Sequence, residues 1–503
     1  MLENEYKTEL RSITKNAGIT AFGIFFMNVL AFATNAIITR TLGAESYGLF
    51  VLATRIIDFI AVVSALGFTA TIVRFVSFYK GKGDFARAKG TILYAAGILF
   101  LTTLFTSTLL FFLSNVISIN IFDRKDLILP LKILIISLPF TVSAGALLSS
   151  LIGLKLIKQN VLVSRIFNPI AYLTLASVCF LLGYRLLGLI TVQVITAILI
   201  FILTLLLVYK KFLVHYKNVK PLVEKKKLWN FSWPLFFNQL FLKALNFSPI
   251  FIMGLYLSTT DIGIFNISFR IALMVSILLS AFRLIFSPTI SGLFARQNKK
   301  LIGQLYKATT KWIFTFSLMV FSIVVLYGET LLRVFGNEFQ TGVLVLLILS
   351  VGELVSASAG LVGNIIIMSG RPKVSLTNSG LTLILVLILC LKLVPEYGIV
   401  GAAIAYATSI ILVNILRISE VFYFERMHPF NFSFLKPVIA AAFSFILVYS
   451  FNDVFNFKIY LKMVVGSILF LCIFCMSIWI LRLDSEDKYI LGIIFSRFKQ
   501  KSE

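Results

Sequence analysis

About fourteen apolar stretches, each long enough to cross a lipid bilayer as a helix, constrain this sequence more than any other feature. A helix needs roughly 20 mostly apolar residues to span the hydrocarbon. Continuous apolar runs of this length form helices, whereas a membrane barrel needs shorter, alternating strands. The sequence therefore predicts an all-α polytopic membrane protein. The predicted spans are 17–39, 48–73, 90–114, 128–152, 162–183, 187–209, 233–257, 262–288, 310–334, 341–368, 374–394, 398–418, 434–451 and 459–481.

Composition and the placement of charge agree with a membrane location. Only 13% of the 503 residues are charged, although a soluble chain carries about 25%. The net charge of +25 would suggest a nucleic-acid partner in a soluble protein. Here 33 of the 46 Lys and Arg residues lie in alternate connections and at both termini. This positive-inside bias predicts a plasma (inner) membrane protein with both termini in the cytoplasm and no nucleic-acid partner.

The sequence contains an internal repeat. Gly48-Leu-Phe50, followed by Arg55, corresponds to Gly263-Ile-Phe265, followed by Arg270, at an ungapped shift of 215. Six spans separate equivalent positions, so the halves have the same orientation, and we expect two parallel six-helix lobes around a central cavity, plus two extra C-terminal helices. The predicted parts are an N-terminal lobe 1–210, a cytoplasmic basic connector 211–232, a C-terminal lobe 233–421, and the last two spans with a cytoplasmic tail, 422–503.

Charged residues inside the predicted spans are candidate site residues, because a charge near the bilayer centre costs about 2.5–3.5 kcal/mol on insertion scales. Arg55 and Asp58 lie three residues apart and hence on one helix face. Arg270 is the repeat partner of Arg55, and Lys243 lies in the seventh span. Arg and Lys side chains suit a phosphate-bearing headgroup. The alternative is a packed core in which Asp58 and other carboxylates neutralise these cations.

Uncharged polar residues extend the predicted cavity lining. Gln239 and Asn246 share a helical face with Lys243, and Asn28 and Asn35 lie one heptad apart in the first span. The shift of 215 relates Asn28 to Lys243. The inner spans of both halves therefore predict one polar lining.

Glu353 lies in the middle of the tenth span. It suits a proton or sodium coupling site and equally well the buried partner of a cation. Cys472 and Cys475 form a CxxC within the last span, where they are expected to be packing neighbours. We expect no metal site and no cofactor.

Several short motifs resemble those of the polysaccharide transporter family. This family contains O-antigen and exopolysaccharide repeat-unit flippases, and it belongs to the superfamily that also includes multidrug extruders and lipid II flippases. The resemblance runs from about residue 10 to 490, and the order of the motifs is more specific than any one of them. The motifs are 40–50, 64–68 with Arg74, 230–234, 261–265, 287–291, 370–373 and 393–403.

The resemblance implies alternating access without enzymatic chemistry. Its implied substrate is an oligosaccharide repeat unit on an isoprenoid diphosphate, moved from the cytoplasmic to the outer leaflet for O-antigen (lipopolysaccharide), exopolysaccharide or capsule biosynthesis. Membrane lipid, H⁺ or Na⁺ as a coupling ion, and the polymerase of the same pathway are the implied partners. A cation-coupled multidrug extruder is the main alternative, although it would need an acidic cavity. A membrane polymerase or glycosyltransferase would need larger external loops than this sequence has.

Overall fold

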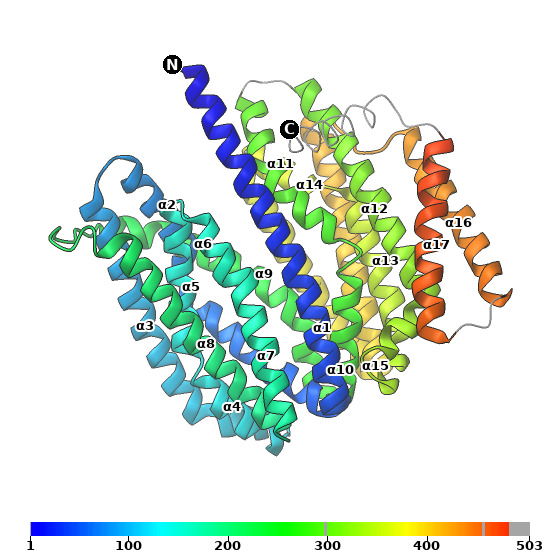
Figure 1. Ribbon diagram of the computed structural model, residues 1–503, viewed down its shortest axis with the longest axis horizontal. Helices are drawn as coiled ribbons and strands as arrows, with labels where there is room; N and C mark the ends of the chain where they lie inside the picture. The colour runs from blue at the N-terminus through cyan, green and yellow to red at the C-terminus, as the bar shows by residue number, and fades with distance from the viewer. Residues whose placement is uncertain (1, 296–298, 455–457, 482–503) are drawn as a thin grey trace. The chain divides into compact units, whose positions relative to one another are not determined.

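The structure is a computed structural model that describes residues 2–295, 299–454 and 458–481 (Figure 1). Across these ranges every regular element is a helix, and ten helices are long and apolar enough to cross a membrane, or up to 12 when each bent pair counts as one span. The predicted all-α polytopic class is confirmed, but the predicted number of fourteen spans is not. Arg296 and the predicted basic tail from Arg482 to Lys501 lie outside the described residues.

Two helices are too long to be single spans. α1 (Leu2–Ala65) has 64 residues and α15 (Pro372–Glu425) has 54. An unbroken helix of 54 residues would measure about 81 Å, whereas the hydrocarbon core is about 30 Å thick. Gly43 (φ 76°) interrupts α1 and Gly398 (φ 58°) interrupts α15, both with left-handed backbone that favours glycine. Each interruption falls where one predicted span ends and the next begins.

Four of the predicted spans are themselves broken, and the breaks occur in equivalent spans of the two halves. Predicted span two divides where α1 gives way to α2, and its repeat partner divides between α10 and α11, with a bend of 59°. Span four divides between α4 and α5, with a bend of 44°, and its partner divides between α13 and α14. These helices are α2 (Phe68–Gly81), α4 (Ile128–Ile135), α5 (Leu138–Gly153), α10 (Thr259–Ala272), α11 (Ile277–Ala295), α13 (Val343–Ala359) and α14 (Val362–Met368).

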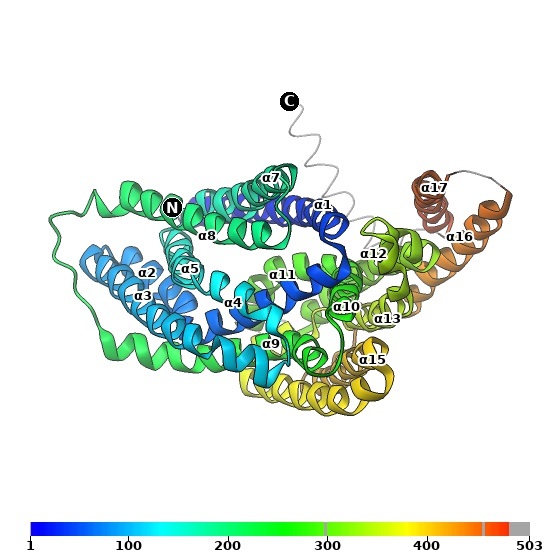
Figure 2. The same cartoon turned by 90° about the horizontal axis from the view of Figure 1, so that it is seen from below.

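The chain divides into two compact units, Met1–Ile264 and Phe265–Glu503. In the first unit, α9 (Lys225–Tyr256), which is the predicted seventh span, packs against α1 and α2. The predicted lobe boundaries come from the sequence repeat alone, and they stay a prediction. The other helices of the first unit are α3 (Phe85–Val116), α6 (Ile157–Val161), α7 (Asn168–Leu181) and α8 (Leu186–Val208), which are coloured from blue to green in Figures 1 and 2.

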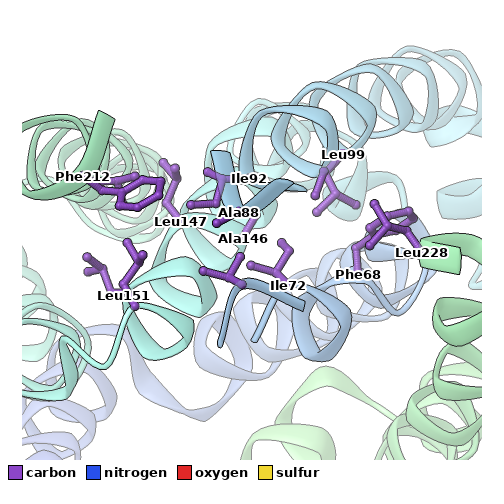
Figure 3. Close-up of a cluster of buried hydrophobic side chains, with 14 of the residues drawn as sticks. Phe68, Ile72, Ala88, Ile92, Leu99, Ala146, Leu147, Leu151, Phe212 and Leu228 are labelled. Carbon is purple, nitrogen blue, oxygen red and sulfur yellow. The ribbon is translucent and has the colours of Figure 1, made fainter. Parts of the chain in front are cut away.

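A buried cluster holds α2, α3 and α5 together in the first unit (Figure 3). Phe68 and Ile72 of α2 face Ala88 of α3 and Ala146 of α5, and all four side chains are at most 1% exposed. Small residues at such contacts let helices approach closely, which is how membrane helices gain packing energy. The cluster fixes α2 beside the helices that follow it.

Close backbone approach also occurs where α1 meets the start of α10 within the first unit. A Cβ added at Gly48 would lie 1.6 Å from the carbonyl oxygen of Thr259, and one added at Gly263 would lie 2.5 Å from that of Ala44. Gly48 and Gly263 are equivalent in the repeat, and each is a glycine because the opposing backbone leaves no room for a side chain.

In the second unit, the last two helices pack against α12 (Lys299–Arg333). Buried Tyr327 of α12 joins Ala440 of α16 (Leu435–Val454) and Phe470 of α17 (Ile459–Ile480) in one cluster. These two helices are the predicted pair that stands outside the repeat.

Candidate functional site

Two predicted site cations of the first unit lie against the same aromatic ring. The guanidinium carbon of Arg55, on α1, is 5.8 Å from the ring centroid of Phe247, on α9. The ammonium of Lys243 is 5.5 Å from the same centroid. Phe59 packs edge-on against this ring at 6.0 Å. The structure therefore brings Arg55 and Lys243 together, and it does so through Phe247.

The two cations differ in their contacts with carboxylates. The Asp58 carboxylate is 3.8 Å from the Arg55 guanidinium, and the two side chains are 45% and 27% exposed. An ion pair this long and this exposed is weak. Lys243 is exposed, and within the described ranges no carboxylate contacts it. An aromatic face attracts a cation without neutralising it, so Lys243 keeps its charge and its N–H donors for an anionic ligand.

The predicted polar residues on α1 and α9 already use their amide groups within the first unit. Asn35 donates to the carbonyl oxygen of Ala31 at 2.6 Å and accepts from the Tyr47 hydroxyl at 3.1 Å, which ties together the two sides of the break at Gly43. Asn246 donates to the carbonyl oxygen of Leu242 at 2.9 Å, and Gln239 lies 3.5 Å from the Thr69 hydroxyl. Asn28 is half-buried on α1. Their part in a ligand site stays a prediction.

The predicted residues of the second unit lie on separate helices. Arg270 is exposed near the end of α10. Glu353 of α13 is 6% exposed and accepts a hydrogen bond of 2.5 Å from Ser276, which lies in the break between α10 and α11. Arg283 of α11 interacts electrostatically with the Glu353 carboxyl. Glu353 is therefore connected both to a cation and to the bend of predicted span eight.

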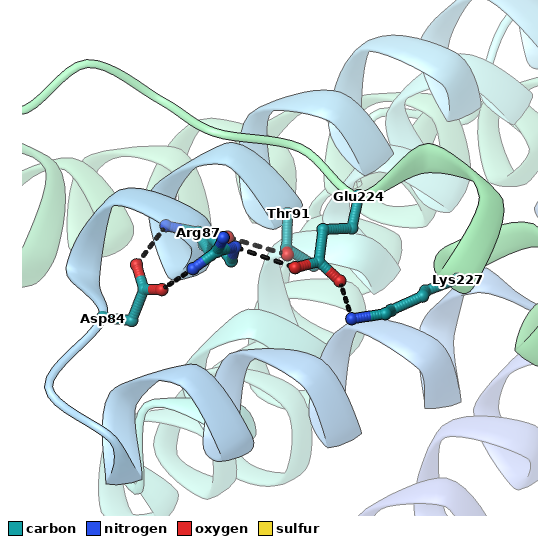
Figure 4. Close-up of polar contacts among 5 residues, drawn as sticks. All are labelled: Asp84, Arg87, Thr91, Glu224 and Lys227. Atoms are coloured by element: carbon teal, nitrogen blue, oxygen red, sulfur yellow. Dashed lines mark hydrogen bonds and ion pairs between the residues drawn. The ribbon is translucent and has the colours of Figure 1, made fainter.

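A charged clamp holds the beginning of α9, which is the predicted cytoplasmic end, against the beginning of α3 (Figure 4). Arg87 donates to Asp84 at 2.5 Å and forms an ion pair with Glu224 at 2.8 Å, and Glu224 also pairs with Lys227. The hydrogen bond from Lys227 is the largest cause that lowers the pKa of Glu224, and the backbone N–H of Arg87 lowers the pKa of Asp84. Here Arg87 and Lys227 pair with carboxylates, whereas Lys243 contacts no carboxylate of the described residues.

The basic connector before α9 is anchored to the beginning of α3, as the clamp is. The Lys89 ammonium donates to the carbonyl oxygens of Tyr216 at 3.0 Å, Lys217 at 3.1 Å and Val219 at 2.9 Å. The Leu222 N–H donates to the carbonyl oxygen of Ala86 at 3.1 Å. These bonds fix the position from which α9 starts, and hence the depth of Lys243.

Sequence reasoning missed Phe247, the residue that joins the two cations. A signal for it existed, because Phe247 lies four residues after Lys243 and therefore on the same helical face. That Arg55 also reaches this ring could not be read from the sequence, since it depends on how α1 packs against α9.

The described residues form an all-helical bundle of membrane-spanning length in which several spans are broken. The chain belongs to the polysaccharide biosynthesis protein family, whose family model matches residues 13–294, more than half of its length. The predicted family resemblance is thereby confirmed.

Two curated relatives and one solved structure are similar to this chain. The capsular polysaccharide biosynthesis protein CapF of Staphylococcus aureus is 26% identical over 224 residues, which are 44% of this chain and 54% of CapF. The probable low-salt glycan biosynthesis flippase Agl15 of Haloferax volcanii is 24% identical over 167 residues, which are 33% of this chain and 35% of Agl15. The chain thus spans about half and about a third of these relatives. The lipid II flippase MurJ, in an inward closed conformation, aligns with a TM-score of 0.71 at 14% identity over 91% of this chain and 97% of MurJ, which shows a shared fold.

Proposed function

We propose that this protein is a flippase that moves oligosaccharide repeat units, linked to an isoprenoid diphosphate, from the cytoplasmic to the outer leaflet of the plasma membrane. The observation that carries the proposal is the pair of cations, Arg55 and Lys243, held on the ring of Phe247. The family, and the names of the relatives in polysaccharide and glycan biosynthesis, support the same substrate class.

The physical problem in flipping such a lipid is to carry a diphosphate and several sugars through hydrocarbon. Burying charge without compensation is very costly, so the path must replace the lost hydration with donors and positive charge. The planar donor fork of Arg55 matches phosphate oxygens, and Lys243 adds a point charge. The isoprenoid tail needs no such replacement and stays in lipid. No bond is made or broken, and the protein therefore acts as a transporter.

The energy source is part of the proposal. With an inside-negative potential, two uncompensated negative charges moving outward would gain about 5 kcal/mol per 100 mV. A proton or sodium ion bound at Glu353 would alter this balance. We place ion coupling at Glu353 because its carboxyl is buried and bonded to Ser276 in the bend between α10 and α11.

The test is complementation of a deletion strain, read out as lipid-linked oligosaccharide in the cytoplasmic leaflet. We expect the deletion to accumulate this intermediate, wild type to clear it, and Arg55→Ala, Lys243→Ala and Arg270→Ala to express but fail. Lys132→Ala is the matched control, because Lys132 of α4 lies 5.5 Å from the ring of Phe111 of α3, the same distance as Lys243 from Phe247. Drug sensitivity without accumulation would instead indicate an extruder, and single repeat units on the cell surface would indicate a polymerase.

A further inference from the structure

Arg74 of α2 is a third cation of the first unit that rests on an aromatic ring of α9. Its guanidinium carbon is 4.1 Å from the ring centroid of Phe231 and 5.9 Å from that of Phe75. The Arg74 side chain is exposed. The short distance to Phe231 holds the planar guanidinium in place while its N–H donors stay accessible.

Among the described residues, no carboxylate pairs with Arg74. Neither α2 nor α9 contains Asp or Glu. The acidic residues that flank these helices, Asp84 after α2 and Glu224 before α9, are occupied by Arg87 and Lys227. In the part of the chain that the structure describes, the Arg74 guanidinium has no hydrogen bond and no ion pair.

The neighbouring cations differ from Arg74 in this respect. The Lys80 ammonium donates to the carbonyl oxygen of Leu154 at 2.7 Å, and Lys89 donates to three carbonyl oxygens of the connector. Burial lowers the pKa of Lys80, as expected for an ammonium engaged in packing. These lysines donate hydrogen bonds to backbone carbonyl oxygens, whereas Arg74 contacts two aromatic rings and makes no hydrogen bond among the described residues.

Arg74 is well separated from the Arg55–Lys243 pair. Their supporting rings, Phe231 and Phe247, lie 16 positions apart on α9, which corresponds to about 24 Å of helix. In a diphosphate, the two phosphorus atoms share one bridging oxygen, so a single diphosphate cannot occupy both places. Phe231 lies near the start of α9 and Phe247 lies two-thirds of the way along it.

We propose that Arg74, supported by Phe231, is a separate binding station for the phosphate-bearing headgroup of an isoprenoid diphosphate, which the headgroup occupies before it reaches Arg55 and Lys243. This inference rests on the proposed function and deepens it, because it divides the path through the first unit into two stations. Arginine suits such a station since its donor fork binds phosphate oxygens in pairs and its charge does not depend on pH.

The test counts ligands on the full-length protein in lipid nanodiscs by native mass spectrometry, with farnesyl diphosphate as the probe. We expect two bound molecules on wild type and one each on Arg74→Gln and Lys243→Gln, with affinity at the lost station reduced at least about tenfold. Lys82→Gln is the matched control, because Lys82 follows α2 directly and lies 4.5 Å from the ring of Phe78. It should leave both molecules bound. Arg74→Lys should retain part of the binding that Arg74→Gln loses. That result would show that the fold tolerates a change at this position.

Two further probes distinguish an isoprenoid diphosphate from an ordinary anionic lipid as the ligand of Arg74. Inorganic pyrophosphate should compete with farnesyl diphosphate for the Arg74 station, because both present the same headgroup. If phosphatidylglycerol displaces the probe from this station alone, the place is an ordinary anionic-lipid site and the proposal is overturned.

The remaining outcomes separate this inference from the proposed function. If Arg74→Gln still binds two molecules while Lys243→Gln binds one, the second station is overturned and the flippase proposal stands. If wild type binds no farnesyl diphosphate, both are overturned.

Discussion

Ser232 of α9 donates a hydrogen bond to the carbonyl oxygen of Leu66, at the point where predicted span two breaks between α1 and α2. A break in a membrane helix leaves backbone groups without their usual partners, and in hydrocarbon each such group costs several kcal/mol. Ser232 is fully buried and satisfies one of them from the neighbouring helix. The broken span and α9 therefore stabilise each other.

The first prediction concerns Gly67, which lies in this break with φ 74°. A Cβ there would lie 2.4 Å from the carbonyl oxygen of Ser232 and 2.7 Å from the Phe236 nitrogen. We expect Gly67→Ala to cost about 1–2 kcal/mol for the left-handed backbone and about 1–3 kcal/mol more for overpacking. Gly83→Ala is the control, because Gly83 has φ 72° but no atom within 4 Å of its Cβ position.

Thermal unfolding in detergent measures both variants, and the fall in Tm should be clearly larger for Gly67→Ala. Equal shifts would mean that the contact between Gly67 and α9 contributes nothing beyond backbone strain.

The second prediction concerns Phe247. Replacing its ring by leucine keeps apolar volume but removes the π face, which is worth about 0.5–2 kcal/mol to a cation. We expect Phe247→Leu to express normally and to bind farnesyl diphosphate several-fold more weakly, because Arg55 and Lys243 lose their common support. Phe251→Leu, one turn further along α9 and packed on Phe122 at 5.2 Å, should bind as wild type does. Equal losses in the two variants would argue for a general packing defect.

The third prediction concerns the pH dependence of the clamp formed by Asp84, Arg87, Glu224 and Lys227. The pKa values of Glu224 and Asp84 are lowered in the folded protein, so their stabilising effect is complete above the ordinary carboxyl pKa of 4.5 for Glu224 and 3.8 for Asp84. It is lost as the pH falls through the lowered values. We therefore expect Glu224→Gln to lower Tm by a constant amount from about pH 5.5 to 8, with the difference from wild type shrinking below about pH 4.

The control for this clamp is Glu396→Gln, which removes an exposed carboxylate of α15 and should leave Tm unchanged at every pH. A difference between Glu224→Gln and wild type that grows on acidification would contradict the sign of the lowered pKa.

The fourth prediction concerns Glu353. Glutamine at this position can still accept the hydrogen bond from Ser276 but carries no charge to titrate. We expect Glu353→Gln to fold, to flip lipid more slowly in reconstituted vesicles and to lose the response of wild type to an imposed proton or sodium gradient. A variant with reduced Tm but the full gradient response would leave Glu353 as the structural partner of Arg283.

Much of the fold could be predicted from sequence because the bilayer imposes simple rules. Helices must satisfy their backbone internally and must be about 20 residues long, so apolar runs predict the spans. The glycines at 43 and 398 interrupt long helices at the predicted boundaries. Pro139 in the sequence indicates the bend in span four, and the structure has a bend of 44° just before it. The break inside span two could not be predicted, because its sequence stays apolar and the compensating contact from Ser232 to Leu66 comes from a distant helix.

The candidate site residues also fall into those that the sequence singles out and those that only the structure shows. Arg55, Lys243 and Glu353 could be identified from sequence because charge inside a predicted span is costly and demands a reason. Asn35 shows the limit of that argument, since its amide bridges the break at Gly43 by bonding Tyr47. The same argument did not single out Arg74, because cations are common near the ends of spans. Its contact with the ring of Phe231 is visible only in the structure.

The sequence by itself determined the membrane class, the repeat and the residues whose charge is expensive in lipid, because each of these follows from local composition or spacing. The family was indicated by the resemblance of short motifs. Only the tertiary structure decided which cations share an aromatic ring. Arg55 and Lys243 are 188 positions apart, and they share Phe247 only because α1 packs on α9. Arg87 reaches Glu224 for the same reason, whereas the pairs of Arg87 with Asp84 and of Lys227 with Glu224 join residues three positions apart.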